Sequence, residues 1–287
     1  MSTVIKIVLA ISLALTLSLA AFGCGEGELT QEDIERIVAD ATTANAAVNT
    51  VSFDMEMEML MDITTPDGPV QMTMVSNGTG TVDQANQKMK ILMDMTMDIP
   101  ELGQQDMDME MYATGGWMYM KMDIPGLGER WVKMPLTEEM WQSQSQFEQQ
   151  VELLRTAREV TFHGSETVNG TACYVVEIVP DMAVLFDIIS QQQMPGMEDM
   201  SMAGLDMGDW FKDFSIKLWV AKDSYLMMKA EEYLLMEITA GDLRGSEDDS
   251  GKMTMDANIT MTCYDYNEDV FIELPEEALE AAEIPGM

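Results

Sequence analysis

Methionine occupies every second position in several segments of this 287-residue chain, and acidic residues fill many of the positions between. In the clearest segment the odd-numbered residues are Phe53, Met55, Met57, Met59, Met61 and Ile63. The even-numbered residues between them are acidic, apart from Leu60. Side chains two apart share a face only on an extended strand, because on a helix they would point about 200° apart. The alternation therefore predicts a β-strand with one methionine face.

The same alternation recurs in residues 89–99, 107–111, 118–124 and 253–261. The intervening positions are mostly charged: Asp94, Asp98, Asp106, Asp108, Glu110, Lys121, Asp123 and Asp256. Charged side chains belong in water, so the pattern indicates an antiparallel sheet with one wet face and one covered face.

Two interpretations of the methionine face stay open. Methionine is unbranched, polarizable and easily repacked, so it specifies a single packed interior poorly and suits a cavity whose contents vary. The other interpretation is a methionine-rich core beneath a helix. Under the first, we expect these residues to contact a ligand: Met55, Met57, Met59, Met93, Met95, Met97, Met109, Met120 and Met255.

The N-terminal segment has the layout of an export signal. Lys6 precedes an apolar run over residues 7–22, which is followed by Gly23 and Cys24. The last six of these residues, 19–24, resemble a lipoprotein signal, in which Cys24 becomes the first mature residue and carries the lipid. We therefore expect a signal peptide (1–23), a short tether (24–30) and a single barrel-like domain (31–287). An uncleaved anchor helix, or an ordinary signal with an incidental cysteine, is the alternative.

The charge is strongly acidic. Removing residues 1–23 leaves 14 basic and 51 acidic side chains, a net charge of −37. Nucleic-acid binding needs the opposite sign, so nucleic acid is not an expected partner. With lipidated Cys24, the expected location is the outer face of the cytoplasmic membrane or the cell envelope.

The order of elements predicts an α+β fold, with helices over one side of a curved antiparallel sheet. The expected helices cover 31–48, which begins with an N-cap at Thr30, then 136–158, 182–192 and a short terminal helix from Pro275. The expected strands include 51–63, 70–82, 88–99 and three strands that end near Tyr266. Gly115-Gly116 and Asn169-Gly170 predict hairpin turns.

Several motifs resemble a known family. They are Met118-Tyr119-Met120-Lys121-Met122, Trp131-Val132-Lys133-Met134, Leu218-Trp219-Val220-Ala221-Lys222-Asp223, Tyr264-Asp265-Tyr266-Asn267 and Leu274-Pro275-Glu276-Glu277-Ala278. With these motifs the chain resembles bacterial lipoproteins of the LolA-like superfamily, near the LppX and LprG group. The resemblance implies a half-open barrel that holds helices in its concave face and binds acyl chains or lipidated proteins there.

Three functions compete. The first is binding of a lipid or another apolar ligand in the methionine-lined concavity, for transport or sensing. The second is binding of Cu(I) or Ag(I), which thioethers favour, through Met194, Met197, Met200 and Met202. The third is a structural or sensory surface domain that acts through an envelope protein partner. We favour the first.

The sequence offers no catalytic motif, and we expect no enzyme activity, no cofactor and no metal site. His163 has no nucleophile near it in the sequence and is expected to be an ordinary polar residue at a strand end. Cys173 and Cys263 could form a disulfide in an exported protein. Their positions in the alternating pattern place them on opposite faces, which argues against the bridge.

Overall fold

The computed structural model describes residues 29–65, 68–100, 103–124, 128–138, 140–141, 157–180, 210–239 and 251–283. The expected signal peptide, and the tether up to residue 28, lie outside these residues. None of the helices in the described part has the length and hydrophobicity that a transmembrane segment needs.

The described residues form mostly strands. They are β1 (Thr50–Thr65), β2 (Gly68–Asp83), β3 (Lys88–Ile99), β4 (Gly103–Thr114), β5 (Trp117–Ile124), β6 (Gly128–Pro135), β7 (Glu159–Val168), β8 (Thr171–Val179), β9 (Phe211–Ala221), β10 (Met227–Thr239), β11 (Lys252–Tyr264) and β12 (Ala282–Glu283). The helical elements are α2 (Gln31–Ala46) and a 3-10 turn, η2 (Glu276–Glu280), where the sequence predicts a short terminal helix. The strands expected from the alternation of methionine are thus confirmed.

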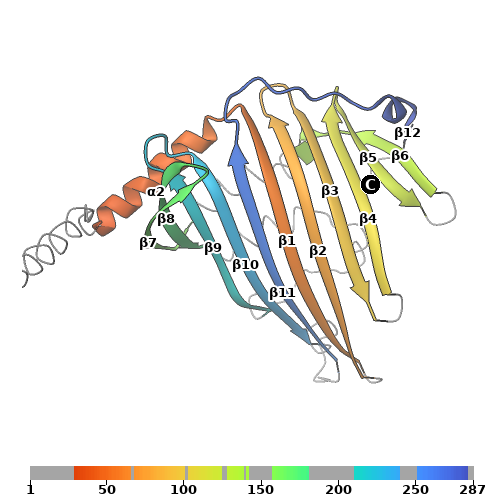
Figure 1. Ribbon diagram of the computed structural model, residues 1–287, viewed down its shortest axis with the longest axis horizontal. Coiled ribbons are helices and arrows are strands. Elements are labelled where there is room, and N and C mark those ends of the chain that lie inside the picture. The colour runs from red at the N-terminus through yellow and green to blue at the C-terminus, as the bar shows by residue number, and fades with distance from the viewer. Residues whose placement is uncertain are drawn as a thin grey trace, which may run out of the picture.

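The strands join into one sheet in the order β12-β6-β5-β4-β3-β2-β1-β11-β10-β9-β8-β7. Neighbouring strands are antiparallel except β12 and β6, which pair in parallel through two residues. Pairing of β1 with β11 joins the first half of the chain to the second at the middle of the sheet (Figure 1). The order is linear, with β7 and β12 at its two edges, so a closed barrel is the wrong description. The expected curved, half-open antiparallel sheet is confirmed.

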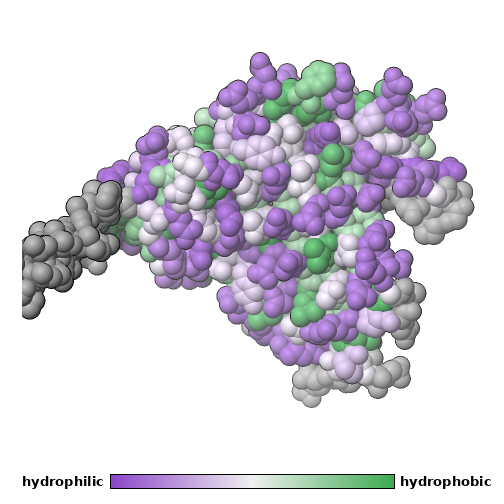
Figure 2. Space-filling model, viewed as in Figure 1, coloured by the Kyte–Doolittle hydropathy of each residue, from purple (hydrophilic) through white to green (hydrophobic). Residues whose placement is uncertain are grey.

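The two faces of the sheet differ in chemistry. Asp54, Glu56 and Glu58 on β1 are exposed, whereas Phe53 and Met55 between them are buried. The face of the sheet that Figure 1 presents is mostly hydrophilic, with scattered apolar residues (Figure 2). This is the wet face that the alternating acids predict.

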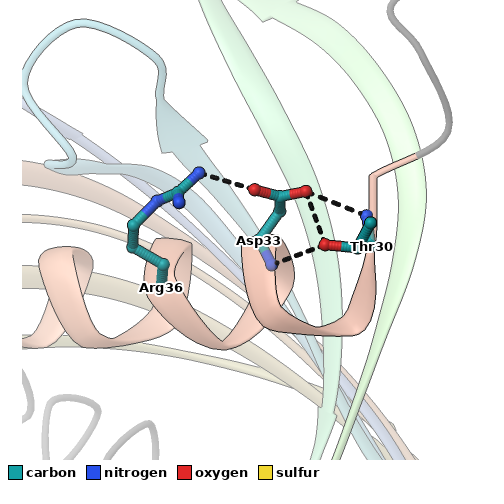
Figure 3. A network of polar contacts seen from close by, with 3 residues as sticks. All are labelled: Thr30, Asp33 and Arg36. Carbon is teal, nitrogen blue, oxygen red and sulfur yellow. Dashed lines mark hydrogen bonds and ion pairs between the residues drawn. The ribbon is translucent and has the colours of Figure 1, made fainter.

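Helix α2 begins with a capping box (Figure 3). Asp33 N–H donates to Thr30 Oγ1 at 3.2 Å, and Thr30 N–H donates to Asp33 Oδ2 at 3.1 Å. Arg36 adds an ion pair to Asp33 at 2.7 Å. Hydrogen bonds from Thr30 hold the pKa of Asp33 below its usual value, and Arg36 lowers this pKa further. The helix start predicted at Thr30 is confirmed.

Helix α2 covers one end of the apolar face. Its buried residues Ile37 and Ala41 belong to the same core cluster as Val51 and Phe53 of β1. The helix also contacts β7 at the edge of the sheet, so the sheet curves around it. The expected helix over the concave face is therefore confirmed for α2.

Asn45 fixes α2 on the sheet. It is 2 % exposed, and its Nδ2 donates to Ala41 O at 2.7 Å and Tyr225 O at 3.1 Å. Met227 N–H donates to Asn45 Oδ1 at 3.0 Å. The buried amide of Asn45 stabilises only one orientation of the helix on the sheet, because any other orientation would leave the amide and its backbone partners without hydrogen bonds.

The two hairpin turns are also confirmed. Gly115 and Gly116 have φ of 61° and 77°, and Asn169 and Gly170 have φ of 49° and 85°. Positive φ at both central residues is the requirement of a type I′ turn, which glycine and asparagine meet at low cost.

Three expected segments fall largely or wholly outside the described residues. They are the helix 136–158, the helix 182–192 and the loop 194–208. Of the first, residues 138, 140 and 141 are helical, whereas 136, 137, 157 and 158 are not.

A glycine in β2 makes room for the ring of Phe53. A Cβ atom on Gly80 would lie 2.1 Å from Phe53 Cζ and 2.5 Å from Cε1. Phe53 is opposite Gly80 in the register of β1 and β2, and it is buried. The ring therefore lies directly over the glycine and replaces the side chain that β2 lacks there.

Gly80→Ala should lower the free energy of unfolding by about 1–3 kcal/mol, because the new methyl group forces the buried ring to move. Urea denaturation measures the loss. In a Phe53→Leu background the ring is absent, so the same substitution should cost clearly less. An equal loss in both backgrounds would contradict this account.

Candidate functional site

The strand register aligns methionines into rows across the sheet. We call four of these the methionine rows and number them from mid-strand toward the β1–β2 turn. The first two rows cross β11, β1, β2, β3 and β4 in that order: the first contains Met261, Met55, Gly78, Met93 and Met109, and the second contains Ile259, Met57, Ser76, Met95 and Met107. The third row crosses β11, β1, β2 and β3 and contains Ala257, Met59, Met74 and Met97. The fourth row crosses β10, β11, β1 and β2 and contains Met236, Met255, Met61 and Met72.

The structure brings the expected ligand-binding residues together. Eight of the nine lie in the methionine rows: Met55, Met57, Met59, Met93, Met95, Met97, Met109 and Met255. Met120 lies one row further from the β1–β2 turn, paired with Met111 and Val132. All nine therefore occupy one continuous face.

Burial divides this face into two parts. Met55 and Met261 in the first row are 9 % and 3 % exposed, and they belong to the core that α2 covers. The methionines of the second to fourth rows are half-buried, apart from Met107, which is exposed at 40 %. In Figure 1 the strands β1, β2 and β11 continue well beyond α2 toward this half-buried end. The methionine face therefore forms a buried core at the end that α2 covers, and its thioethers remain accessible at the end near the β1–β2 turn.

Two polar residues on this face were not among the expected site residues. Ser76 lies in the second row between Met57 and Met95, is 1 % exposed, and has no hydrogen-bond partner for its Oγ among the described residues. Glu232 of β10 lies in the same row, between Ile216 and Ile259, and is half-buried. The sequence could have identified both residues, because each occupies a position that the alternation assigns to the apolar face of its strand.

Small residues of β2 lie along the same face. A Cβ atom on Gly78 would lie 2.9 Å from Met93 Cγ, so this methionine leans over the glycine much as Phe53 leans over Gly80. Ser76 continues this line toward the half-buried rows. Large side chains of β1 and β3 thus cover β2 from both sides.

The opposite face is polar and well connected. Tyr264 O–H donates to Asp54 at 2.9 Å, and Lys121 forms ion pairs with Glu110 at 3.3 Å and Glu129 at 3.2 Å. Burial and the hydrogen bond to Asp54 raise the pKa of Tyr264 to about 12. This hydroxyl therefore stays a hydrogen-bond donor throughout the physiological pH range.

A separate pocket of about 970 Å³ lies where the start of α2 meets β7. Leu29, Ile34, Arg158, Val160 and Phe162 are among its lining residues. None of the nine expected methionines lines it, so it is distinct from the methionine rows.

Cys173 and Cys263 are both free and buried, so the expectation against a disulfide between them is confirmed. Cys263 belongs to the main core, whereas Cys173 packs with Val175 and Trp219 in a second cluster. Burial raises the pKa of Cys263 to about 12 and also raises the pKa of Cys173. Both groups therefore remain neutral thiols at physiological pH, with little thiolate for nucleophilic attack or metal binding.

The sequence predicts that His163 lies at a strand end, but it lies within β7. Its Nε2 is 2.6 Å from Glu177 Oε2, at a register irregularity between β7 and β8. The described residues contain no group of three or more His, Cys, Asp or Glu side chains placed to hold a metal ion. The expected metal candidates, Met194, Met197, Met200 and Met202, lie outside the described residues.

A family model described as a family of unknown function (DUF6612) matches residues 33–283 of the chain. No curated protein matches it significantly.

Solved structures match with low sequence identity. LprF from Mycobacterium bovis is 15 % identical, with a TM-score of 0.44, over 85 % of this chain and 98 % of that one. Lipoprotein LppX from Mycobacterium tuberculosis is 10 % identical, with a TM-score of 0.40, over 85 % of this chain and 100 % of that one. A putative outer membrane lipoprotein-sorting protein domain from Vibrio parahaemolyticus is 14 % identical, with a TM-score of 0.25, over 85 % and 95 %. At these identities and TM-scores, neither a superfamily nor a ligand is transferred from these structures to this chain.

Met55→Asp and Met59→Asp test the division of the methionine face. Met55→Asp should lower the free energy of unfolding by about 3–5 kcal/mol, because it places a carboxylate in the core. Met59→Asp, four residues along the same face of β1, should cost only about 1–2 kcal/mol, because a half-buried carboxylate keeps part of its hydration. Urea denaturation compares the two. Equal losses would show that the two parts of the face are equally buried.

Proposed function

This chain belongs to the family of unknown function DUF6612, and we propose that it is an exported, lipid-anchored protein that binds a lipid or another apolar ligand on its methionine rows. The observation that carries the proposal is the run of half-buried methionines in the second to fourth rows, on the apolar face of a curved sheet. Large accessible apolar surfaces are uncommon on soluble proteins unless they bind something.

Methionine suits a long-chain ligand. A thioether side chain has three rotatable bonds and a polarizable sulfur, so it adapts to chains of different length and saturation. Contact area supplies most of the affinity in such a site, and a few polar groups set orientation. The proposed contact residues are the methionines named from the sequence apart from Met55, which belongs to the core, together with Met61, Met72 and Met74 of the third and fourth rows.

We further propose that Cys24 carries the lipid anchor. Each buried methylene contributes about 0.8 kcal/mol to membrane binding, so two or three acyl chains hold a protein without a spanning helix. The seven residues 24–30 reach at most about 24 Å, so the start of α2 would lie close to the bilayer surface. A ligand would then have a short path between the membrane and the sheet.

The proposal includes no catalytic step, and the protein would act by holding or presenting its ligand. An envelope protein could receive that ligand, and the acidic face would be the surface left for contact with it. Transport and sensing both fit this arrangement.

Native mass spectrometry after gentle purification should show a lipid adduct on the wild-type protein. Met59→Gln with Met74→Gln should lower the adduct fraction at least tenfold, because two adjacent thioethers in the third row are replaced by amides that must be desolvated. The control is Leu60→Gln with Val75→Gln, which removes apolar area from the opposite face of the same strands, where Val75 is 43 % exposed. This control should leave the adduct fraction unchanged.

A wild-type protein that stays at its apo mass when offered lipid vesicles would contradict the proposal. Stoichiometric uptake of Cu(I) by the same sample would favour the metal function instead.

Cys24→Ala should release the protein from membranes into the soluble fraction, because it removes the acyl chains that hold it there. Membrane fractionation with an antibody against the domain measures the distribution. Ser12→Ala, within the same signal, is the control and should leave the protein bound. Continued membrane association of Cys24→Ala would disprove lipid anchoring at this cysteine.

A further inference from the structure

Ser76 is a polar side chain without a partner in the middle of the methionine rows. It is 1 % exposed, and its Oγ forms no hydrogen bond with the described residues. Its neighbours in the second row are Met57 and Met95, so its side chain emerges on the face that carries the thioethers. Buried hydroxyl groups are nearly always hydrogen-bonded, and an unpaired one opposes folding.

A second buried serine shows how the same sheet satisfies this group elsewhere. Ser52 of β1 lies on the opposite face, is 9 % exposed, and its Oγ is 3.2 Å from Thr81 Oγ1. At Ser76 the neighbours are thioethers, which are weak acceptors. Alanine would fill the position at Ser76 without an unpaired group, so packing alone does not account for the hydroxyl.

We propose that Ser76 donates a hydrogen bond to the carbonyl oxygen of an acyl ester held on the methionine rows, and that it makes this site selective for acyl-ester lipids over ether-linked lipids of the same length. This inference rests on the proposed function, because it concerns the ligand of the same site. Ser76 is a positioning residue, which fixes where along the rows the ester lies.

The position of Ser76 along the rows fits an ester at the head of an acyl chain. Successive rows are two residues apart along a strand, and each residue adds about 3.3 Å, so the third and fourth rows extend about 13 Å beyond Ser76. These rows contain Met59, Met74, Met61 and Met72, which are half-buried thioethers without a charged neighbour in their own rows on β1 and β2. The carbonyl would therefore lie at Ser76, and the hydrocarbon would lie along the accessible methionines.

Charge favours an ester over a free fatty acid. The chain has a formal net charge of −36, and Glu232 lies in the same row as Ser76. A carboxylate ligand would enter this field with a charge of the same sign, whereas an ester carbonyl accepts the same hydrogen bond without a charge.

The test compares two phosphatidylcholines with identical chain lengths, one ester-linked and one ether-linked, because the ether lipid lacks both carbonyls. Their affinities are measured by competition for the purified full-length protein against a fluorescent lipid. The wild type should bind the ester lipid about five- to tenfold more tightly. Ser76→Ala should bind the two lipids equally, and Ser52→Ala should keep the wild-type preference. Urea denaturation should show that Ser76→Ala is at least as stable as the wild type, because it removes an unpaired buried hydroxyl.

The outcomes separate the two proposals. Equal binding of both lipids by the wild type, or an ester preference that persists in Ser76→Ala, would overturn the role of Ser76 and leave the proposed function intact. Failure of the wild type to bind either lipid would overturn the proposed function, and the role of Ser76 with it.

Discussion

Every strand places successive side chains on opposite faces, so the register between strands decides which residues become neighbours. Here β1, β2, β3 and β11 are aligned so that methionine meets methionine: Met59 is opposite Met74, and Met74 is opposite Met97. The same register sets Asp94 directly opposite Asp108 on the other face, which is an unfavourable pair. A slip of one residue would move all the carboxylates onto the apolar face. The separation of thioethers from carboxylates therefore determines the register, and repulsion between exposed acids is tolerated because water screens it.

Stability and function occupy different parts of the apolar face. At one end, α2, Phe53 and Met55 form a closed core, and Asn45 holds the helix in one orientation through its hydrogen bonds with Tyr225 and Met227. Beyond Met55 the same strands continue with half-buried methionines that contribute less to that core. A substitution in the far rows can thus alter ligand contacts at small cost to folding. This division gives one continuous sheet both a fixed framework and an adaptable surface.

Much of the fold follows from local sequence patterns. The period of two predicts β3 at its observed bounds, Thr30 marks the start of α2, and Asn169-Gly170 marks a type I′ hairpin, because each signal depends on only a few adjacent residues. The opposite placement of Cys173 and Cys263 follows from the same period. The burial boundary after Met55 could not be predicted, because it depends on where α2 docks rather than on β1 itself. The half-open sheet was expected from the resemblance to a family, but the strands at its two edges, β7 and β12, were not, and β12 has only two residues.

The site residues missed from the sequence, Ser76 above all, show the limit of reading composition alone. Nine methionines were recognised because they are large and repeated, whereas the only signal for Ser76 is its position on the apolar parity of β2. Its significance appears only when the register places it between Met57 and Met95 and burial leaves its hydroxyl without a partner. Thioethers supply contact area that is insensitive to the length of a chain, so they cannot by themselves fix where a ligand lies. A single directional donor among them can, because its hydrogen bond forms only where the ligand carries an acceptor. Adaptable area and one fixed polar point together would let such a site accept varied chains while holding each at the same ester.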